Sequence, residues 1–234
     1  MRTVLKSNTE TLIMKGLKMD AIEKMKSGAL YGSADQSLLS KQTLCLEKLY
    51  DYNATRPSEF KKREALLKEM FAEIGEGCYI EPPLHANWGG GNCHFGKNVY
   101  ANFNLTLVDD NDIYVGDYTM LAPNVVIATA GHPILPPLRE KAFQYNVPVH
   151  IGKNCWIGAG ALIMPGVTIG DNTVIGAGSV VTKDIPANVV AVGNPCRVVR
   201  EIGDHDRKFY FKDKKIDYTA PEVIEVLGKE VNND

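Results

Sequence analysis

Residues 151–186 read IGKNCW IGAGAL IMPGVT IGDNTV IGAGSV VTKDIP, and this stretch decides the fold. An aliphatic residue opens every hexad, and in four of the six the next residue is glycine. The leading residues are Ile151, Ile157, Ile163, Ile169, Ile175 and Val181. A helix cannot hold this register, because six is not close to a multiple of 3.6, and an ordinary strand alternates with a period of two. A six-residue repeat fits one flat side of a β-helix, in which three sides make a coil of about 18 residues.

The repeat also predicts which side chains point inward. The leading aliphatic residue should face the axis and stack on its copies in neighbouring coils. Corners favour Gly, Asn or Asp, which tolerate positive φ, and GKN (152–154) and GDN (170–172) fit. Looser copies precede the regular ones from residue 95 onward, among them FGKNVY and VGDYTM. Because flat, glycine-rich sides allow a second copy to pack closely, we expect a homo-oligomer.

A loop interrupts the repeats. The repeats stop after Ile127 and resume near Val149. Between them lies GHPILPPLREKAFQYNVP (131–148), which contains four prolines. We therefore expect a stiff loop near 131–148 that protrudes from the coil.

The chain divides into four segments by pattern. Residues 1–19 are expected to be a flexible extension, 20–76 a helical capping segment, 77–202 the β-helix and 203–234 a C-terminal tail. Helical spacing predicts helices from Asp20 to Gly28, from about Ser37 to Tyr52, and after Pro57 with Ser58 as N-cap.

Composition excludes several classes of protein. The 234 residues carry 26 basic and 28 acidic side chains, so no global field for nucleic acid is expected. No apolar run reaches the roughly 20 residues that a spanning helix needs. The five cysteines are widely spaced, which is typical of free thiols in a reducing compartment. We expect a cytoplasmic protein with neither a membrane nor a nucleic acid as partner.

Longer motifs narrow the identification. These are MKSGALYGSAD (25–35), YANFNLTLVDD (100–110), GHP (131–133), NCWIGAGALIMPGVTIGDNTVIGAGSVVTKDIP (154–186) and GNPCRVVREI (193–202). They closely resemble the galactoside and maltose O-acetyltransferases among the hexapeptide-repeat acyltransferases, and the resemblance covers about residues 20 to 212. It implies a mainly β protein with a left-handed parallel β-helix, although parallel crossovers are generally right-handed. It also implies a homotrimer with active sites between subunits, acetyl-CoA as donor, no metal, and the 6-hydroxyl of a sugar or glycoside as acceptor.

The resemblance assigns two catalytic residues. His132 would be the general base, and a neutral imidazole with a pKa of about 6.5 suits proton abstraction from a hydroxyl. The alternative reading is a turn histidine that caps a corner. Asn102 would face the transition state, where an amide donates to developing oxyanion charge without titrating. As a plain corner residue, Asn102 would have no such role.

The acceptor site would contain Ser33, Asn87, Tyr100, Asn102 and Asp110 by the same resemblance. Asp109 is equally plausible by its chemistry, and only the resemblance favours Asp110. Ser33 and Gln42 stand where the galactoside branch has an acid and an arginine, and Gln144 replaces an apolar residue of the family. Because few contacts recognise a sugar, such changes can redirect acceptor choice.

The donor site would lie on the late coils. The resemblance places the pantetheine arm of coenzyme A along Trp156, Ala159 and Ala177. The phosphate and nucleotide end matches Thr182, Lys183, Arg197 and Arg200. Arginine offers bidentate contacts to phosphate and lysine a compact charge. The alternative is that these side chains are a packing indole and solvated charges.

Three other functions remain open at this stage. His85, His94 and His150 together with His132 could form the three-histidine zinc site of β-helical carbonic anhydrases. A non-catalytic β-helix scaffold would use its flat faces only for assembly. A related acetyltransferase could keep the coenzyme A site and use a non-sugar acceptor.

Overall fold

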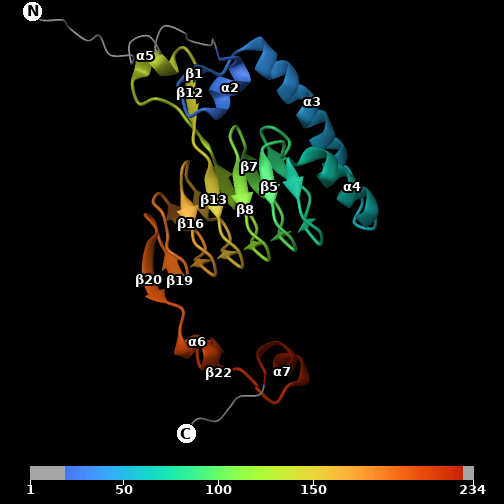
Figure 1. Ribbon diagram of the computed structural model, residues 1–234, viewed down its shortest axis with the longest axis vertical. Helices are drawn as coiled ribbons and strands as arrows, with labels where there is room; N and C mark the ends of the chain where they lie inside the picture. Colours follow the sequence, from blue (N-terminus) through green and yellow to red (C-terminus); the bar gives the residue numbers. More distant parts are fainter. Residues whose placement is uncertain (1–18, 229–234) are drawn as a thin grey trace, which may run out of the picture.

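In the computed structural model, which describes residues 19–228, short parallel strands stack into a three-sided β-helix (Figure 1). Side 1 consists of β2 (Glu73–Ile74), β5 (Cys93–Phe95), β8 (Ile113–Val115), β13 (Val149–Ile151) and β16 (Thr168–Ile169). Side 2 consists of β3 (Tyr79–Ile80), β6 (Tyr100–Ala101), β9 (Met120–Leu121), β14 (Trp156–Ile157), β17 (Val174–Ile175) and β19 (Val189–Val192). Side 3 consists of β4 (His85–Ala86), β7 (Thr106–Val108), β10 (Val126–Ala128), β15 (Leu162–Ile163) and β18 (Val180–Val181). The chain runs from side 1 to side 2 to side 3 in each coil, which is the β-helical fold expected from the repeats.

The inward positions of the repeat are confirmed. The six leading residues of 151–186 are at most 3% exposed, and they belong to one core cluster that runs the length of the coils. The fifth residue of each hexad is buried as well, as Cys155 and Thr173 show. Each coil therefore buries two side chains per side, which is why the fifth position is small or aliphatic.

The corner between sides 1 and 2, called corner 1–2, repeats one chemistry. Its third residue has positive φ, with values of 53° at Asn154 and 58° at Asn172. The glycine that opens the corner has a different reason for being small. A Cβ at Gly152 would lie 2.6 Å from the backbone nitrogen of Asp171 in the next coil. The asparagines of this corner therefore have the expected positive φ. Glycine is needed at the first position for another reason, because the backbones of neighbouring coils approach too closely there for a Cβ.

Three helices precede the coil: α2 (Ala21–Lys26), α3 (Gln36–Asn53) and α4 (Phe60–Met70). In Figure 1, α4 and the end of α3 lie at the first coil, whereas α2 lies beside β1 and β12. The expected N-cap Ser58 is wrong. Glu59 holds that position without a side-chain cap, because its carboxylate accepts from the backbone N–H of Arg56 at 2.6 Å. Tyr52 of α3 is fully buried and donates its hydroxyl to the Ile80 carbonyl at 2.5 Å, which fixes the helices to the first coil.

The protruding loop leaves the coil after β10 and returns at β13, as expected. It contains β11 (Ala130–Gly131), α5 (Pro136–Arg139) and β12 (Phe143–Asn146). Strand β12 lies between β11 and β1 (Tyr31–Gly32) and is antiparallel to both. This small sheet, visible above the coils in Figure 1, joins the N-terminal segment to the loop.

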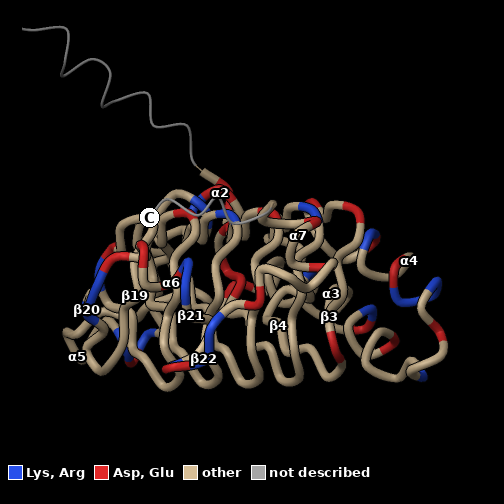
Figure 2. The backbone as a smooth tube through the Cα atoms, turned by 90° about the horizontal axis from the view of Figure 1, so that it is seen from below, with Lys and Arg blue, Asp and Glu red and all other residues tan. Residues whose placement is uncertain are grey.

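The chain continues past the coils through β20 (Arg197–Glu201), which is antiparallel to β19. The tail then forms α6 (Asp204–Lys208), β21 (Phe209–Phe211), β22 (Lys214–Lys215) and α7 (Pro221–Leu227), and it extends away from the coils in Figure 1. Charges of both signs are interspersed in Figure 2, as the balanced composition predicts. Within residues 19–228, no helix is both long and apolar enough to cross a bilayer. All five cysteines are free.

Candidate active site

The corner between sides 3 and 1, called corner 3–1, differs in sequence from coil to coil. Asn87 follows β4, Asp109 and Asp110 follow β7, and the loop with His132 follows β10. Thr129 marks the exit of the loop: its hydroxyl donates to the Val108 carbonyl at 2.7 Å and accepts from the Asn111 N–H at 2.9 Å. Successive coils therefore place Asn87, Asp110 and the start of the loop along one edge of the β-helix.

Asp109 and Asp110 have separate roles. Asp109 is completely buried and accepts the backbone N–H groups of Trp88 at 2.7 Å and Gly90 at 3.0 Å. Burial raises the pKa of Asp109 to about 6, even though these N–H groups act in the opposite direction. Asp109 thus holds the turn that presents Asn87, while Asp110 lines the pocket described next.

A pocket of about 220 Å³ lies where corner 3–1 meets the small sheet and α3. It is lined by Tyr31, Ser33, Leu38, Leu39, Gln42, Asn87, Trp88, Asp110 and Gln144. Asp110 is the hub of its polar wall: it accepts from the Asn87 amide at 2.9 Å and from the Gln144 amide at 3.1 Å. The structure therefore brings together three of the expected acceptor residues, Ser33, Asn87 and Asp110. The two departures Gln42 and Gln144 line the same pocket.

Ser33 and His132 are positioned by the small sheet. The Ser33 hydroxyl donates to the Ala142 carbonyl at 2.9 Å, beside the pairing of β1 with β12. His132 is exposed, and its Nδ1 lies 2.8 Å from the Phe143 carbonyl oxygen. A carbonyl can only accept, so Nδ1 carries the proton and Nε2 of the neutral ring has a free lone pair. This tautomer is the one that a general base needs at Nε2.

Asn102 and Tyr100 lie on another part of the β-helix, away from corner 3–1. Asn102 follows β6, at the corner between sides 2 and 3, and its Oδ1 accepts the Phe103 N–H at 2.8 Å. Its Nδ2 therefore remains available as a donor. Tyr100 is 37% exposed on side 2 and stacks on Tyr79 with the ring centroids 6.3 Å apart. Side 3 separates Asn102 from corner 3–1, so one chain does not place Asn102 beside the loop that carries His132.

The expected donor residues all lie on the late coils and on β20. Trp156 is 57% exposed on side 2, and Ala159 and Ala177 stack at the corner between sides 2 and 3, where the Gly178 N–H donates to the Ala159 carbonyl at 2.8 Å. Thr182 and Lys183 are exposed at corner 3–1.

The two arginines differ in availability. Arg197 donates to the Cys196 carbonyl at 2.7 Å. Arg200 pairs with both carboxylate oxygens of Asp206 at 2.7 and 2.8 Å, and this pair lowers the pKa of Asp206 to about 2. A phosphate would have to compete with Asp206 for Arg200.

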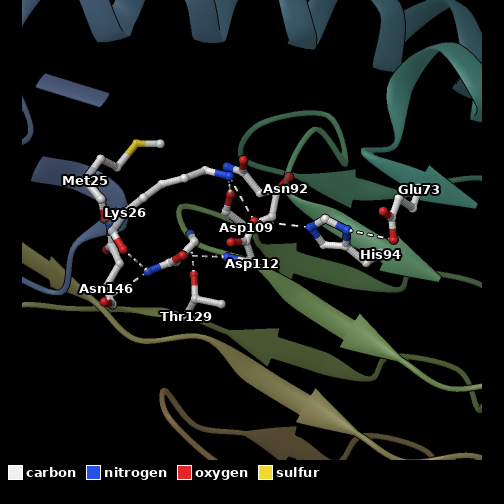
Figure 3. A network of polar contacts seen from close by, with 10 residues as sticks. Met25, Lys26, Glu73, Asn92, His94, Asp109, Asp112, Thr129 and Asn146 are labelled. Carbon is white, nitrogen blue, oxygen red and sulfur yellow. Dashed lines mark hydrogen bonds and ion pairs between the residues drawn. The ribbon is translucent and has the colours of Figure 1, made fainter. Parts of the chain in front are cut away.

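The histidines do not form the zinc site considered from the sequence. His94 and His150 stand on side 1 on opposite faces of Tyr114, with centroids 4.5 and 4.6 Å from the tyrosine ring. Figure 3 shows that His94 instead joins Glu73 and Asp112, and Asp112 pairs with Lys26 of α2 at 2.9 Å. His85 lies on side 3. Among residues 19–228, no three metal-binding side chains converge.

Sequence reasoning did not assign Tyr31, Leu38, Leu39 and Trp88 to the pocket that they line, nor did it indicate Asn146, which bonds to Gln144 and Tyr31. Asn146 is fully buried, and its Nδ2 donates to the Met25 carbonyl and to the Tyr31 hydroxyl. Asn146 of β12 thus contacts α2 and β1, which lie more than 100 residues earlier in the sequence, so no local pattern indicates these contacts. The one available signal was the glycine run after Trp88, where a Cβ at Gly90 would lie 2.5 Å from Cδ1 of the Phe71 ring.

Comparison with known proteins agrees with this architecture. The "Bacterial transferase hexapeptide (six repeats)" model matches residues 148–183, and the "Maltose acetyltransferase hexapeptide capping motif" model matches residues 24–75. The galactoside O-acetyltransferase of Escherichia coli (strain K12) is 49% identical over 201 residues, which are 86% of this chain and 98% of the relative.

Two solved structures are similar over most of their length. A galactoside acetyltransferase in complex with coenzyme A is 50% identical with a TM-score of 0.82, over 85% of this chain and 99% of the other. A maltose O-acetyltransferase from Clostridium difficile 630 is 47% identical with a TM-score of 0.77, over 80% and 99%. The chain belongs to the galactoside and maltose O-acetyltransferase family of hexapeptide-repeat proteins.

Proposed function

We propose that this protein transfers the acetyl group of acetyl-CoA to the 6-hydroxyl of a sugar or glycoside. The observation that carries the proposal is the 50% identical relative in complex with coenzyme A, whose fold this chain shares over 85% of its length. The polar pocket around Asp110 supports a polyhydroxylated acceptor, because carboxylate and amide groups are suited to binding hydroxyls.

The proposed reaction is direct transfer in a ternary complex. Nε2 of His132 takes the proton of the acceptor hydroxyl as the hydroxyl oxygen attacks the thioester carbonyl. The free Nδ2 of Asn102 donates to the oxyanion that develops on the carbonyl oxygen. Collapse of the tetrahedral intermediate breaks the carbon–sulfur bond, and the leaving thiolate takes the proton from His132. Trp156, Ala159, Ala177, Thr182, Lys183, Arg197 and Arg200 would hold coenzyme A along the late coils.

We further propose a homotrimer in which each active site lies between two copies. Within one chain, Asn102 and His132 stand at different corners, so a neighbouring copy would bring its Asn102 to the loop. Side 2 supports such contacts, because Tyr100, Met120 and Trp156 form an exposed apolar column in strand register. The free cysteines support a reducing compartment such as the cytoplasm.

The proposed chemistry is tested by release of coenzyme A thiol from acetyl-CoA over a panel of glucosides, galactosides, maltose, and unrelated amines and alcohols. Release that depends on the sugars supports the proposal. Release with only the amines or alcohols would mean that the acceptor of the reaction is not a sugar. Absence of acetyl-CoA binding in a titration would indicate a scaffold.

The shared site is tested by subunit complementation. His132→Ala and Asn102→Ala proteins are dissociated, mixed and reassembled, and thiol release is measured with the best acceptor of the panel. We expect activity to reappear in the mixture, because some interfaces then combine an intact His132 with an intact Asn102. Each variant reassembled alone is the control. No recovery would place both residues in one copy.

A further inference from the structure

Gln144 occupies the wall of the acceptor pocket, between the small sheet and corner 3–1. It lies on β12 and is 7% exposed. Its Nε2 lies 2.8 Å from Asn146 Oδ1, 3.1 Å from Asp110 Oδ1 and 2.9 Å from the Tyr31 hydroxyl oxygen. An apolar side chain could make none of these bonds, so Gln144 contributes to the polar character of this wall.

The orientation of the Gln144 amide follows from its neighbours. The Asn146 side chain is 2.9 Å from the Met25 carbonyl, which can only accept, so the nitrogen of the Asn146 amide must face Met25. The oxygen of that amide then faces Gln144 and requires a donor. The Asp110 carboxylate makes the same demand from another direction. A flipped Gln144 amide would place Oε1 against two acceptor oxygens, so Nε2 faces these two residues.

This orientation leaves Oε1 of Gln144 without a hydrogen-bond partner among residues 19–228, although the residue lines the pocket. The neighbouring Tyr31 hydroxyl oxygen accepts from the Asn146 amide at 3.0 Å, and burial raises the pKa of the phenol. Tyr31 thus keeps its proton and lines the same pocket. Oε1 is not sealed from solvent, so it is an acceptor that water can occupy in the free protein and that a sugar hydroxyl can occupy when the acceptor binds.

We propose that Gln144 is an acceptor-specificity residue, whose Oε1 accepts a hydrogen bond from a sugar hydroxyl next to the hydroxyls that Asp110 binds. The inference rests on the proposed transfer of acetyl to a sugar and adds which acceptors are chosen. Acceptors that carry this hydroxyl are favoured. Acceptors that present a methylene or another apolar group there leave Oε1 unpaired and are rejected.

The test is a deoxy scan of the best acceptor from the panel, with the wild-type protein and Gln144→Met. We expect one monodeoxy analogue to lose about 10-fold to 100-fold in kcat/KM with the wild type. With the parent sugar, the kcat/KM of Gln144→Met should be lower than that of the wild type by a similar factor. With that analogue, the kcat/KM of the variant should be close to that of the wild type, because the hydrogen bond is already absent. The loss should be confined to the acceptor, with the KM for acetyl-CoA unchanged.

Controls separate this result from a structural effect. Gln36→Met removes an exposed glutamine at the start of α3, outside the pocket, and should leave the whole scan unchanged. Gln144→Leu repeats the experiment if the methionine variant does not fold. If the loss in kcat/KM from Gln144→Met and the loss from removing a hydroxyl multiply at every deoxy position, Gln144 does not bind any of these hydroxyls. The proposal for Gln144 is then wrong, while the transfer of acetyl to the sugar stands. If no sugar accepts acetyl from the wild type, the proposed function fails and the inference fails with it.

Discussion

Corner 1–2 and corner 3–1 are two turns of the same coil, yet they are built in opposite ways. Corner 1–2 repeats a third residue of positive φ, which is asparagine in most coils, and asparagine side chains of neighbouring coils bond to one another, as Asn172 does to Asn188 at 2.9 Å. Corner 3–1 uses a different solution in almost every coil and includes a buried carboxylate and a protruding loop. The regular corner holds the coils in register, whereas the irregular corner holds polar side chains for binding and reaction.

The largest predicted effect separates activity from stability at corner 3–1. His132→Ala should lower the rate of acetyl transfer by about 10²–10⁴-fold, because the general base is lost. The free energy of unfolding should fall by less than about 1 kcal/mol, since the side chain is exposed and makes one hydrogen bond, to Phe143. Steady-state kinetics and urea unfolding measure the two quantities. Near-normal transfer by this variant would contradict the assignment of the base.

Asp109 provides the second prediction, because its pKa of about 6 lies above the ordinary value of 3.8. In the folded protein this carboxyl binds its proton more tightly than in the unfolded chain. Its contribution to stability is therefore full below about pH 4 and declines as the pH rises through 6. The difference between the two pKa values corresponds to about 3 kcal/mol.

The measurement is the difference in unfolding free energy between the wild type and Asp109→Asn, followed from pH 4 to pH 7. The difference should shift by up to about 3 kcal/mol in favour of the variant as the pH rises. Comparison with the asparagine variant removes the contribution of the other carboxyl groups. A difference that does not vary with pH would show that Asp109 titrates at its ordinary value and that burying its ionised carboxylate at corner 3–1 costs no stability.

The contrast between the corners also explains what the sequence could predict. The hexad phase of 151–186 predicted the coil, the inward side chains and the limits of the loop, because each repeat is fixed by its immediate neighbours. Chemistry alone did not separate Asp109 from Asp110, since both are carboxylates that follow β7, and only the family resemblance favoured Asp110. Their difference arises from the turn at Trp88, one coil earlier. Tyr31, Gln144 and Asn146 meet through the small sheet, whose strands pair across more than 100 residues, and no periodic signal reports such a pairing.

The smallest predicted effect concerns corner 1–2, where Asn172 has two separable contributions. Its φ of 58° disfavours residues with an ordinary Cβ, and its side chain bonds to Asn154 and Asn188. Asn172→Gly should lose only the side-chain bonds, about 1 kcal/mol or less because the site is exposed. Asn172→Ala should lose about 1–2 kcal/mol more, the cost of the left-handed conformation. Urea unfolding measures both variants, and the kinetics of acetyl transfer should be unchanged in each. Equal losses in the two variants would mean that the asparagine ladder, and not backbone conformation, selects this residue. A loss of activity in either variant would mean that the regular corner also shapes the active site, and the division of labour between the two corners would fail.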